Sequence, residues 1–166
     1  MAELTNLESK LGEVVGLAMA AQVATKKVAT LARKDKKTGL VATLQKMGDD
    51  AREAQERGTA VAESFEGKKS AILKEAREVK QKGADMLSTY LDDESDTLDG
   101  LEFLTMAEAG EVGHWEILAH LNKRAHHAGV RELTSWGIPI QQRHLTEVRA
   151  SSLQLADEED PDETVS

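Results

Sequence analysis

The C-terminal third of the chain carries two pairs of glutamate and histidine, each pair three residues apart. Glu111 and His114 form the first pair, and His144 and Glu147 form the second. In a helix, side chains at this spacing project from one face. Carboxylates and imidazoles are ligands of iron, manganese and zinc, and metal-binding helical bundles supply them to their interior in this way. Each pair is therefore a candidate half of a metal site.

The segments that position these pairs are predicted to be amphipathic helices. The first spans residues 101–129, and its inward stripe reads Leu104, Ala107, Glu111, His114, Leu118, Leu121, Ala125 and Ala128. The second begins at Val130, and we expect it to be interrupted at Gly137–Pro139 and then to continue to Ala156. Its inner positions read Leu133, Gly137, Ile140, His144, Glu147 and Ser151. Both pairs then face the interior of a helical bundle.

A turn at Gly129 would make these two helices an antiparallel hairpin. Residues whose numbers add to about 258 then lie at the same height, because both helices rise equally per residue. This register places His114 opposite His144 and Glu111 opposite Glu147. The break near Pro139 could shift the register by a residue or two.

Four such groups in an apolar interior must bind one another, water or a metal, because burying them unpaired costs several kcal/mol. One reading is an iron, manganese or zinc ion held by His114, His144 and one carboxylate, with open positions for oxygen or peroxide. The other is two hydrogen-bonded pairs of Glu and His that fix the helix register without a metal. A third reading, a bundle that opens on lipid, follows from the Ala- and Lys-rich, aromatic-poor helices.

Composition favours a single all-α domain. The chain has 166 residues, 40% of them AVILMFWYC but only 3% aromatic, so the core is built from Ala, Val, Leu and Met. Small aliphatic side chains suit close-packed helices better than a sandwich or a barrel. Because the chain has no cysteine, thiolate ligands and disulfides are excluded.

The rest of the chain supplies the other helices of the bundle. Thr5 and Glu8 fit a capping box at the start of a first helix that ends by about Arg33. Residues 40–92 follow as either one bent helix or two. We expect the bundle to comprise residues 1–156 as antiparallel hairpins with an extra helical segment. Residues 157–166 are acidic without an apolar anchor and are predicted to form a disordered tail.

Charge and hydropathy exclude some classes of partner. A formal net charge of −9 argues against binding nucleic acid, since phosphate contacts need a concentrated basic face. The longest mostly apolar run, Val14–Ala24, is too short to cross a bilayer, and the N-terminus lacks a basic region. We therefore expect a cytoplasmic protein that does not insert stably into membranes.

The segment Glu111–Leu118, with its His-Trp-Glu-Ile run, resembles the "EHYEIA" helix of the bacterial ferritin-like stress proteins of the YciF type. A looser similarity covers Leu7–Leu11, which resembles that family's "AEKQL", and Phe65–Gly67, where its second helix ends. The resemblance implies a ferritin-like four-helix bundle with a di-metal core, a homodimer, and a role in the stress response.

The chain departs from that family's pattern at the proposed ligands. Gly113 stands where the motif has Glu, and Gln142 and Arg143 stand where the last helix has paired glutamates. A di-iron site needs about four carboxylates with two histidines. The first two helices offer only flanking candidates, which are Glu8, Glu13, Asp50 and Glu53. The resemblance therefore implies either a reduced metal site at Glu111, His114, His144 and Glu147, or a metal-free scaffold that keeps the fold.

Overall fold

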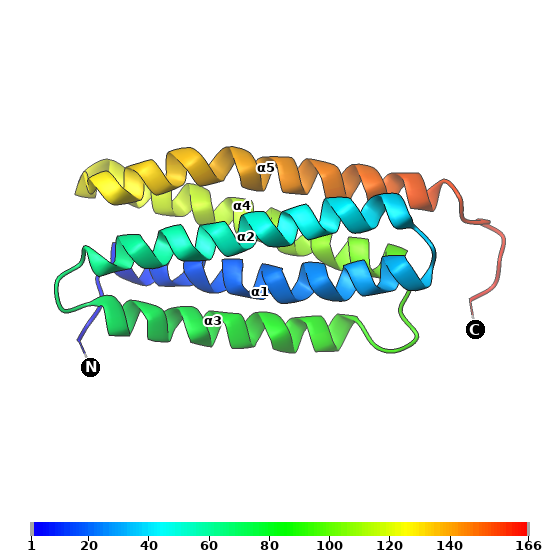
Figure 1. The fold of residues 1–166 in the computed structure, drawn as a ribbon, viewed down its shortest axis with the longest axis horizontal. Coiled ribbons are helices and arrows are strands. Elements are labelled where there is room, and N and C mark those ends of the chain that lie inside the picture. Colours follow the sequence, from blue (N-terminus) through cyan, green and yellow to red (C-terminus); the bar gives the residue numbers. More distant parts are fainter. Residues whose placement is uncertain (1, 166) are drawn as a thin grey trace.

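Five helices make up the computed structural model, which describes residues 2–165 (Figure 1). They are α1 (Asn6–Lys34), α2 (Thr38–Glu63), α3 (Lys69–Tyr90), α4 (Thr97–Ala125) and α5 (Ala128–Ala156). No strand occurs within these residues. The prediction of an all-α chain is confirmed.

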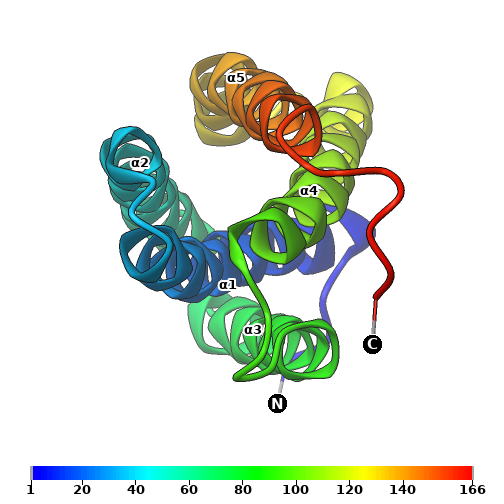
Figure 2. The same cartoon turned by 90° about the vertical axis from the view of Figure 1, so that its right-hand side faces the viewer.

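α1 is the central helix of the molecule. It packs against α2, α3 and α4, whereas α5 packs against α4 and, less extensively, α2. The end-on view shows α1, α2, α5 and α4 surrounding a common interior, with α3 on the outer side of α1 (Figure 2). Leu11, Val14 and Val28 of α1 are at most 1% exposed, because helices cover α1 on several sides. This arrangement makes the space between the four surrounding helices the place where inward side chains of α2, α4 and α5 can meet.

Local signals fix most helix ends. Thr5 and Glu8 form the predicted capping box, in which Thr5 accepts from the Glu8 backbone and Glu8 accepts from the Thr5 backbone. Asp96 and Asp99 form a second box at the start of α4. Gly67 has a φ of +72°, in the left-handed region that favours glycine. The backbone turns there, so residues 40–92 form two helices with a short connection.

The turn between α4 and α5 lies earlier than predicted. α4 ends at Ala125, His126 takes the left-handed conformation with a φ of 55°, and the His127 side chain caps α5 by accepting from the Val130 backbone. The prediction of a turn at Gly129 is wrong. The Asn122 side chain bonds both the N–H and the carbonyl of His127, which holds the two-residue turn in place.

α5 is continuous through Pro139, so the predicted interruption at Gly137–Pro139 is also wrong. Proline removes one hydrogen bond from a helix and normally kinks or breaks it. Here the preceding turn is packed tightly, because Gly137 lies directly against the fully buried indole of Trp115. Packing against α4 outweighs the local preference to break.

α1 is the one helix within residues 2–165 that is long and apolar enough to cross a membrane by length and composition. More than half of its most apolar window, 56%, is buried within the bundle. A core helix passes the same test, so this feature adds little to the case for a membrane span.

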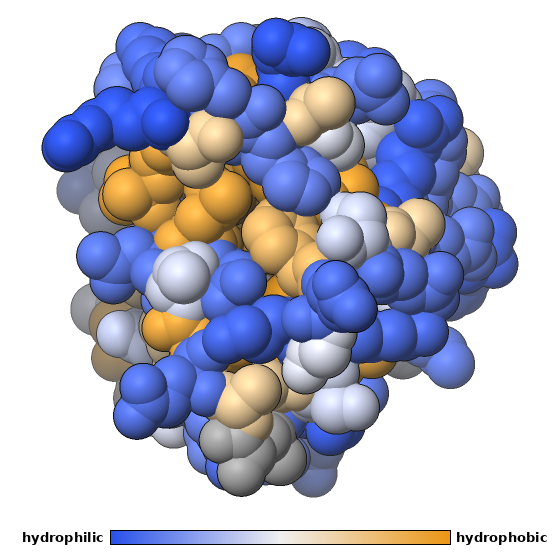
Figure 3. Space-filling model, turned by 90° about the vertical axis from the view of Figure 1, so that its left-hand side faces the viewer, coloured by the Kyte–Doolittle hydropathy of each residue, from blue (hydrophilic) through white to orange (hydrophobic). Residues whose placement is uncertain are grey.

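Two surface features complete the bundle. At the end where α1 begins and α4 ends, hydrophobic side chains show between hydrophilic ones (Figure 3). An open hollow there is lined by Leu7 of α1 and by Gly113, Ile117 and Leu121 of α4. At the other end, Glu158 of the predicted acidic tail pairs with Lys37 at 2.5 Å. The start of the tail therefore contacts the turn between α1 and α2.

Candidate functional site

His144 of α5 lies at the centre of a polar layer inside the bundle. Its Nε2 is 2.9 Å from Oδ2 of Asp50 on α2, and its Nδ1 is 3.7 Å from Oε2 of Glu108 on α4. The side chains of His144 and Glu108 are each 2% exposed. Three helices therefore bring a buried imidazole between two buried carboxyl groups.

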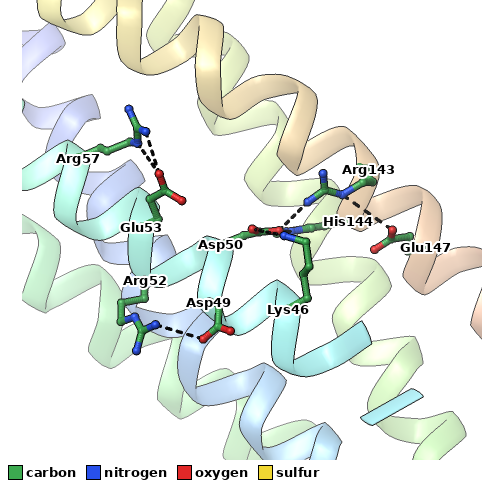
Figure 4. A network of polar contacts seen from close by, with 9 residues as sticks. All are labelled: Lys46, Asp49, Asp50, Arg52, Glu53, Arg57, Arg143, His144 and Glu147. Carbon is green, nitrogen blue, oxygen red and sulfur yellow. Dashed lines mark hydrogen bonds and ion pairs between the residues drawn. The ribbon is translucent and has the colours of Figure 1, made fainter. Parts of the chain in front are cut away.

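Asp50 is surrounded by cations (Figure 4). Lys46 donates to its Oδ1 at 2.9 Å, and Arg143 donates to its Oδ2 at 2.6 Å. Burial by itself would raise the pKa of Asp50, but the hydrogen bonds from Lys46 and His144 outweigh it and lower this pKa below its usual value. Asp50 is therefore a carboxylate, and the Nε2 of His144 carries the hydrogen that it accepts.

Two acidic groups raise the pKa of His144. Burial acts in the opposite direction and would lower it, but Glu108 first and Asp50 second favour the charged ring. With carboxyl groups facing both nitrogens, the imidazolium can direct one N–H toward each. Both carboxyl groups therefore favour the protonated form of His144.

Glu111 lies one turn from Glu108 on α4 and is 4% exposed. Burial, and then the neighbouring Glu108, raise the pKa of Glu111 well above its usual value. The amide of Gln141 on α5 bridges the two acids, with its nitrogen 2.8 Å from Oε2 of Glu111 and 3.2 Å from Oε2 of Glu108 in the orientation that satisfies both. The buried surroundings of Glu111 therefore disfavour its charged form.

These directions predict that stability falls as the pH rises. Because folding raises the pKa of Glu111, the protonated side chain contributes to the free energy of unfolding. This contribution is fully present below about pH 4.5 and is lost as the pH rises through the pKa of Glu111 in the folded protein. The raised pKa of His144 acts in the same direction, so the free energy of unfolding decreases further as the pH rises above about 6.5. We expect Glu111→Gln to raise the free energy of unfolding at pH 8 by about 1 kcal/mol, because a buried charge is removed, and to have much less effect at pH 4.

Urea denaturation followed by circular dichroism, in buffers containing a chelator, measures this difference. Glu116→Gln, a change at an exposed position of the same helix, is the control and should leave the pH dependence unchanged. Parallel stability curves for wild type and Glu111→Gln between pH 4 and pH 9 would contradict the proposed state of Glu111.

Of the four ligands predicted from the sequence, the structure brings only Glu111 and His144 into this layer. The Nδ1 of His114 faces Glu13 at 3.1 Å and Lys10 at 3.2 Å, both on α1, and its side chain is 39% exposed. Glu147 is 41% exposed and lies beside Arg143, 3.8 Å from its Nε (Figure 4). The predicted facing pair of His114 and His144 is not formed.

The earlier turn explains the different register. When the hairpin turns at His126 and His127 and not at Gly129, each residue of α5 lies opposite a residue of α4 that is several positions closer to its N-terminus. His144 therefore meets Glu108, and Gln141 meets Glu111.

Sequence reasoning missed Glu108 and Gln141 as members of the layer, and it considered Asp50 only as a flanking candidate. A signal was present in their spacing, because Glu108 precedes Glu111 by three residues, as Gln141 precedes His144. A second inward stripe on α4 through Leu101, Glu108 and Trp115 satisfies the same helical periodicity as the stripe that was chosen.

As the side chains stand, no three His, Asp or Glu residues between positions 2 and 165 are grouped in a way that could hold a metal ion. The layer nevertheless has the right donor types, since it contains carboxylate oxygens, one imidazole nitrogen and one amide. The chain matches no protein-family model, no curated protein and no solved structure.

Proposed function

We propose that the polar layer binds one divalent transition-metal ion, with iron as the first candidate and manganese or zinc as others. Glu108, Glu111 and His144 would hold the ion, and Asp50 would orient the imidazole. The observation that carries this proposal is the position of His144, whose Nε2 contacts Asp50 while its Nδ1 faces Glu108. Histidines that bind metals commonly donate their other N–H to a carboxylate in this way.

Charge in the interior supports the proposal. Without a metal, the raised pKa values of His144 and Glu111 favour a proton on each of these side chains. A divalent ion that displaces both protons leaves the net charge of the layer unchanged. Metal binding would therefore replace buried protons without adding buried charge, and it would be favoured by rising pH.

One ion fits this chain better than two. A di-iron centre draws carboxylates from all four helices of a bundle. Here the acids of α1 are used elsewhere, since Glu8 caps the helix and Glu13 pairs with Lys10 and His114. We therefore propose a reduced version of the ferritin-like site, in which a redox-active ion would supply oxygen or peroxide chemistry. The ferritin-like relationship, the homodimer and the stress-related role remain part of this proposal.

Metal content distinguishes the ligands proposed from the structure from those predicted from the sequence. We expect purified protein loaded with Fe²⁺ or Zn²⁺ to retain about one ion per chain, measured by inductively coupled plasma mass spectrometry. Glu108→Gln and Glu111→Gln should lower affinity at least about tenfold. His114→Ala and Glu147→Gln, whose side chains lie outside the layer, should retain the ion.

Stability provides a second measurement. A ligand at 100 times its Kd stabilises the native state by about 2.7 kcal/mol, so the melting temperature should rise with added metal. If His114→Ala loses the ion and Glu111→Gln retains it, the metal is bound by the residues predicted from the sequence and the proposed site is wrong.

A metal-free scaffold is the second candidate, and the surroundings of Asp50 favour it. Lys46, Arg143 and His144 already satisfy this carboxylate, so the layer is stable without a metal. In that case the layer fixes how α2, α4 and α5 pack. The scaffold predicts the same melting temperature with chelator, iron or zinc.

A further inference from the structure

The outer face of α4, which points towards neither α1 nor α5, carries exposed apolar side chains (Figure 2). Met106 and Ile117 on this face are 41% and 48% exposed. Met86 and Tyr90, near the end of α3, are 46% and 59% exposed and lie beside Met106. These are four of the seven large hydrophobic side chains that are exposed within residues 2–165. Their concentration on one side of the molecule indicates a contact surface.

Charges of opposite sign flank the apolar part of this face. Glu102 lies one helical turn before Met106, and Arg124 lies two turns after Ile117. Both charged side chains are exposed, and neither forms an ion pair within residues 2–165. The outer face of α4 therefore has an acidic end, an apolar middle and a basic end in one line.

This order is complementary to itself when a second α4 runs in the opposite direction. If the two helices cross at Gly113, residues whose numbers add to about 226 face one another, because both helices rise equally per residue. Glu102 then faces the partner's Arg124, and Met106 faces the partner's His120. By symmetry each of these contacts occurs twice.

Small residues at the crossing would let the two helices approach closely. A Cβ atom added at Gly110 or Gly113 would meet no heavy atom within 4 Å, so the space outside them is open. Ala109 is exposed on the same face, and in this register it faces the partner's Ile117. Helices in contact through small residues pack at the short end of the usual range, about 8 Å between axes. The partner would therefore cover the exposed side chain of Ile117.

The open hollow at the end of α4 fits the same arrangement. Leu7 of α1 lines this hollow together with Ile117 and Leu121. In a two-fold dimer, the side of α4 next to α1 lies beside the same side of the partner. The partner's Met106 and the partner's Tyr90 would then lie over the hollow, so the exposed apolar side chains of each copy would cover the apolar hollow of the other.

We propose that the protein forms a two-fold symmetric homodimer in which the outer faces of two α4 helices pack antiparallel and cross at Gly113. A second copy fits this face because its acidic and basic ends match each other when one copy is reversed. The proposal names the surface used by the homodimer of the proposed function. It does not rest on a bound metal, because the polar layer lies on the inner face of α4.

Sedimentation velocity of the full-length protein, in buffer with a chelator, tests the interface. We expect a dimer whose fraction rises with protein concentration. Ile117→Glu should weaken dimerisation at least about tenfold, because the new charge would lose its water against the partner's Ala109. Leu153→Glu is the matched control, since Leu153 is 62% exposed on α5, outside this surface, and its replacement should leave dimerisation unchanged.

Charge reversal tests the register of the two helices. Glu102→Arg would bring two arginines together at both ends of the interface, and Arg124→Glu would bring two glutamates together. Each variant alone should dimerise at least about tenfold more weakly than wild type. An equimolar mixture of the two should recover dimers, because their charges complement each other across the two-fold axis. The double variant should dimerise like wild type for the same reason.

Three results would overturn the proposal, provided that circular dichroism shows a native fold in each variant. The first is a monomer at about 100 μM, where a dimer with a Kd of about 1 μM would be nearly complete. The second is a dimer that Ile117→Glu leaves unchanged, which would keep the homodimer but place it on another surface. The third is no recovery of dimers when Glu102→Arg and Arg124→Glu are mixed. Metal content is measured separately, so none of these results bears on the metal site.

Discussion

Replacing His144 by alanine is expected to lower the free energy of unfolding by about 3–5 kcal/mol, the usual loss when one partner of a buried ion pair is removed. Within residues 2–165, His144 is the one cationic partner of Glu108, which would lose it while remaining 2% exposed. Asp50 would keep Lys46 and Arg143 but lose the contact on its inner side. A loss of this size is a large part of the stability of an ordinary domain.

Urea denaturation near pH 6 in the presence of a chelator measures this loss, because His144 is then charged and no metal can contribute. The control is His120→Ala, whose ring is exposed on α4 and contacts Lys123 and the Glu116 carbonyl. We expect that change to stay within about 0.5 kcal/mol of wild type. If His144→Ala costs less than about 1 kcal/mol, the two acids do not depend on the imidazolium as proposed.

Gly137→Ala is expected to destabilise the protein by about 2–3 kcal/mol through overpacking. A Cβ atom at this position would lie 2.2 Å from Cζ3 and 2.5 Å from Cη2 of Trp115. The indole is fully buried and a close-packed core has little room for it to move. The steric cost should exceed the gain of about 1 kcal/mol that alanine normally brings to the interior of a helix.

Gly113→Ala is the matched control on α4, and it should have the opposite sign. A Cβ atom there would meet no heavy atom within 4 Å. We expect this change to stabilise the protein by up to about 1 kcal/mol, because only the helix propensity changes. Thermal and chemical denaturation of both variants would test the pair. A stable Gly137→Ala protein would show that α4 and α5 can separate, and the contact of Trp115 with Gly137 would then not fix their packing.

Local chemistry in the sequence was sufficient to predict most of the helices. The capping box at Thr5 and Glu8 and the end of α1 near Arg33 are both confirmed within one or two residues. These features depend on neighbours within four positions along the chain, so the sequence itself contains the whole interaction. The all-α class followed from the same periodicity and from the aliphatic composition.

Which face of α4 points into the bundle could not be predicted from such local features. The stripe through Ala107, His114 and Leu121 and the stripe through Glu108, Trp115 and Asn122 differ by one residue, and both satisfy a helical period. The prediction from the sequence used the first stripe and did not consider the second. The structure buries the second, since Gln141 and His144 of α5 supply partners for the acids at Glu108 and Glu111.

Most of the helical segments, the cap of the first helix and the inward position of Glu111 and His144 could be predicted from the sequence alone. Which of the inward side chains contact one another depended on how the helices pack. That choice depended on a two-residue turn at His126 and His127, on the packing of Gly137 against Trp115, and on Asp50, which approaches from α2 at a distance of 94 residues along the chain. The physical reason is that burying a polar group is unfavourable unless a partner forms a hydrogen bond or ion pair with it. Here those partners come from other helices, and local periodicity in the sequence cannot identify them.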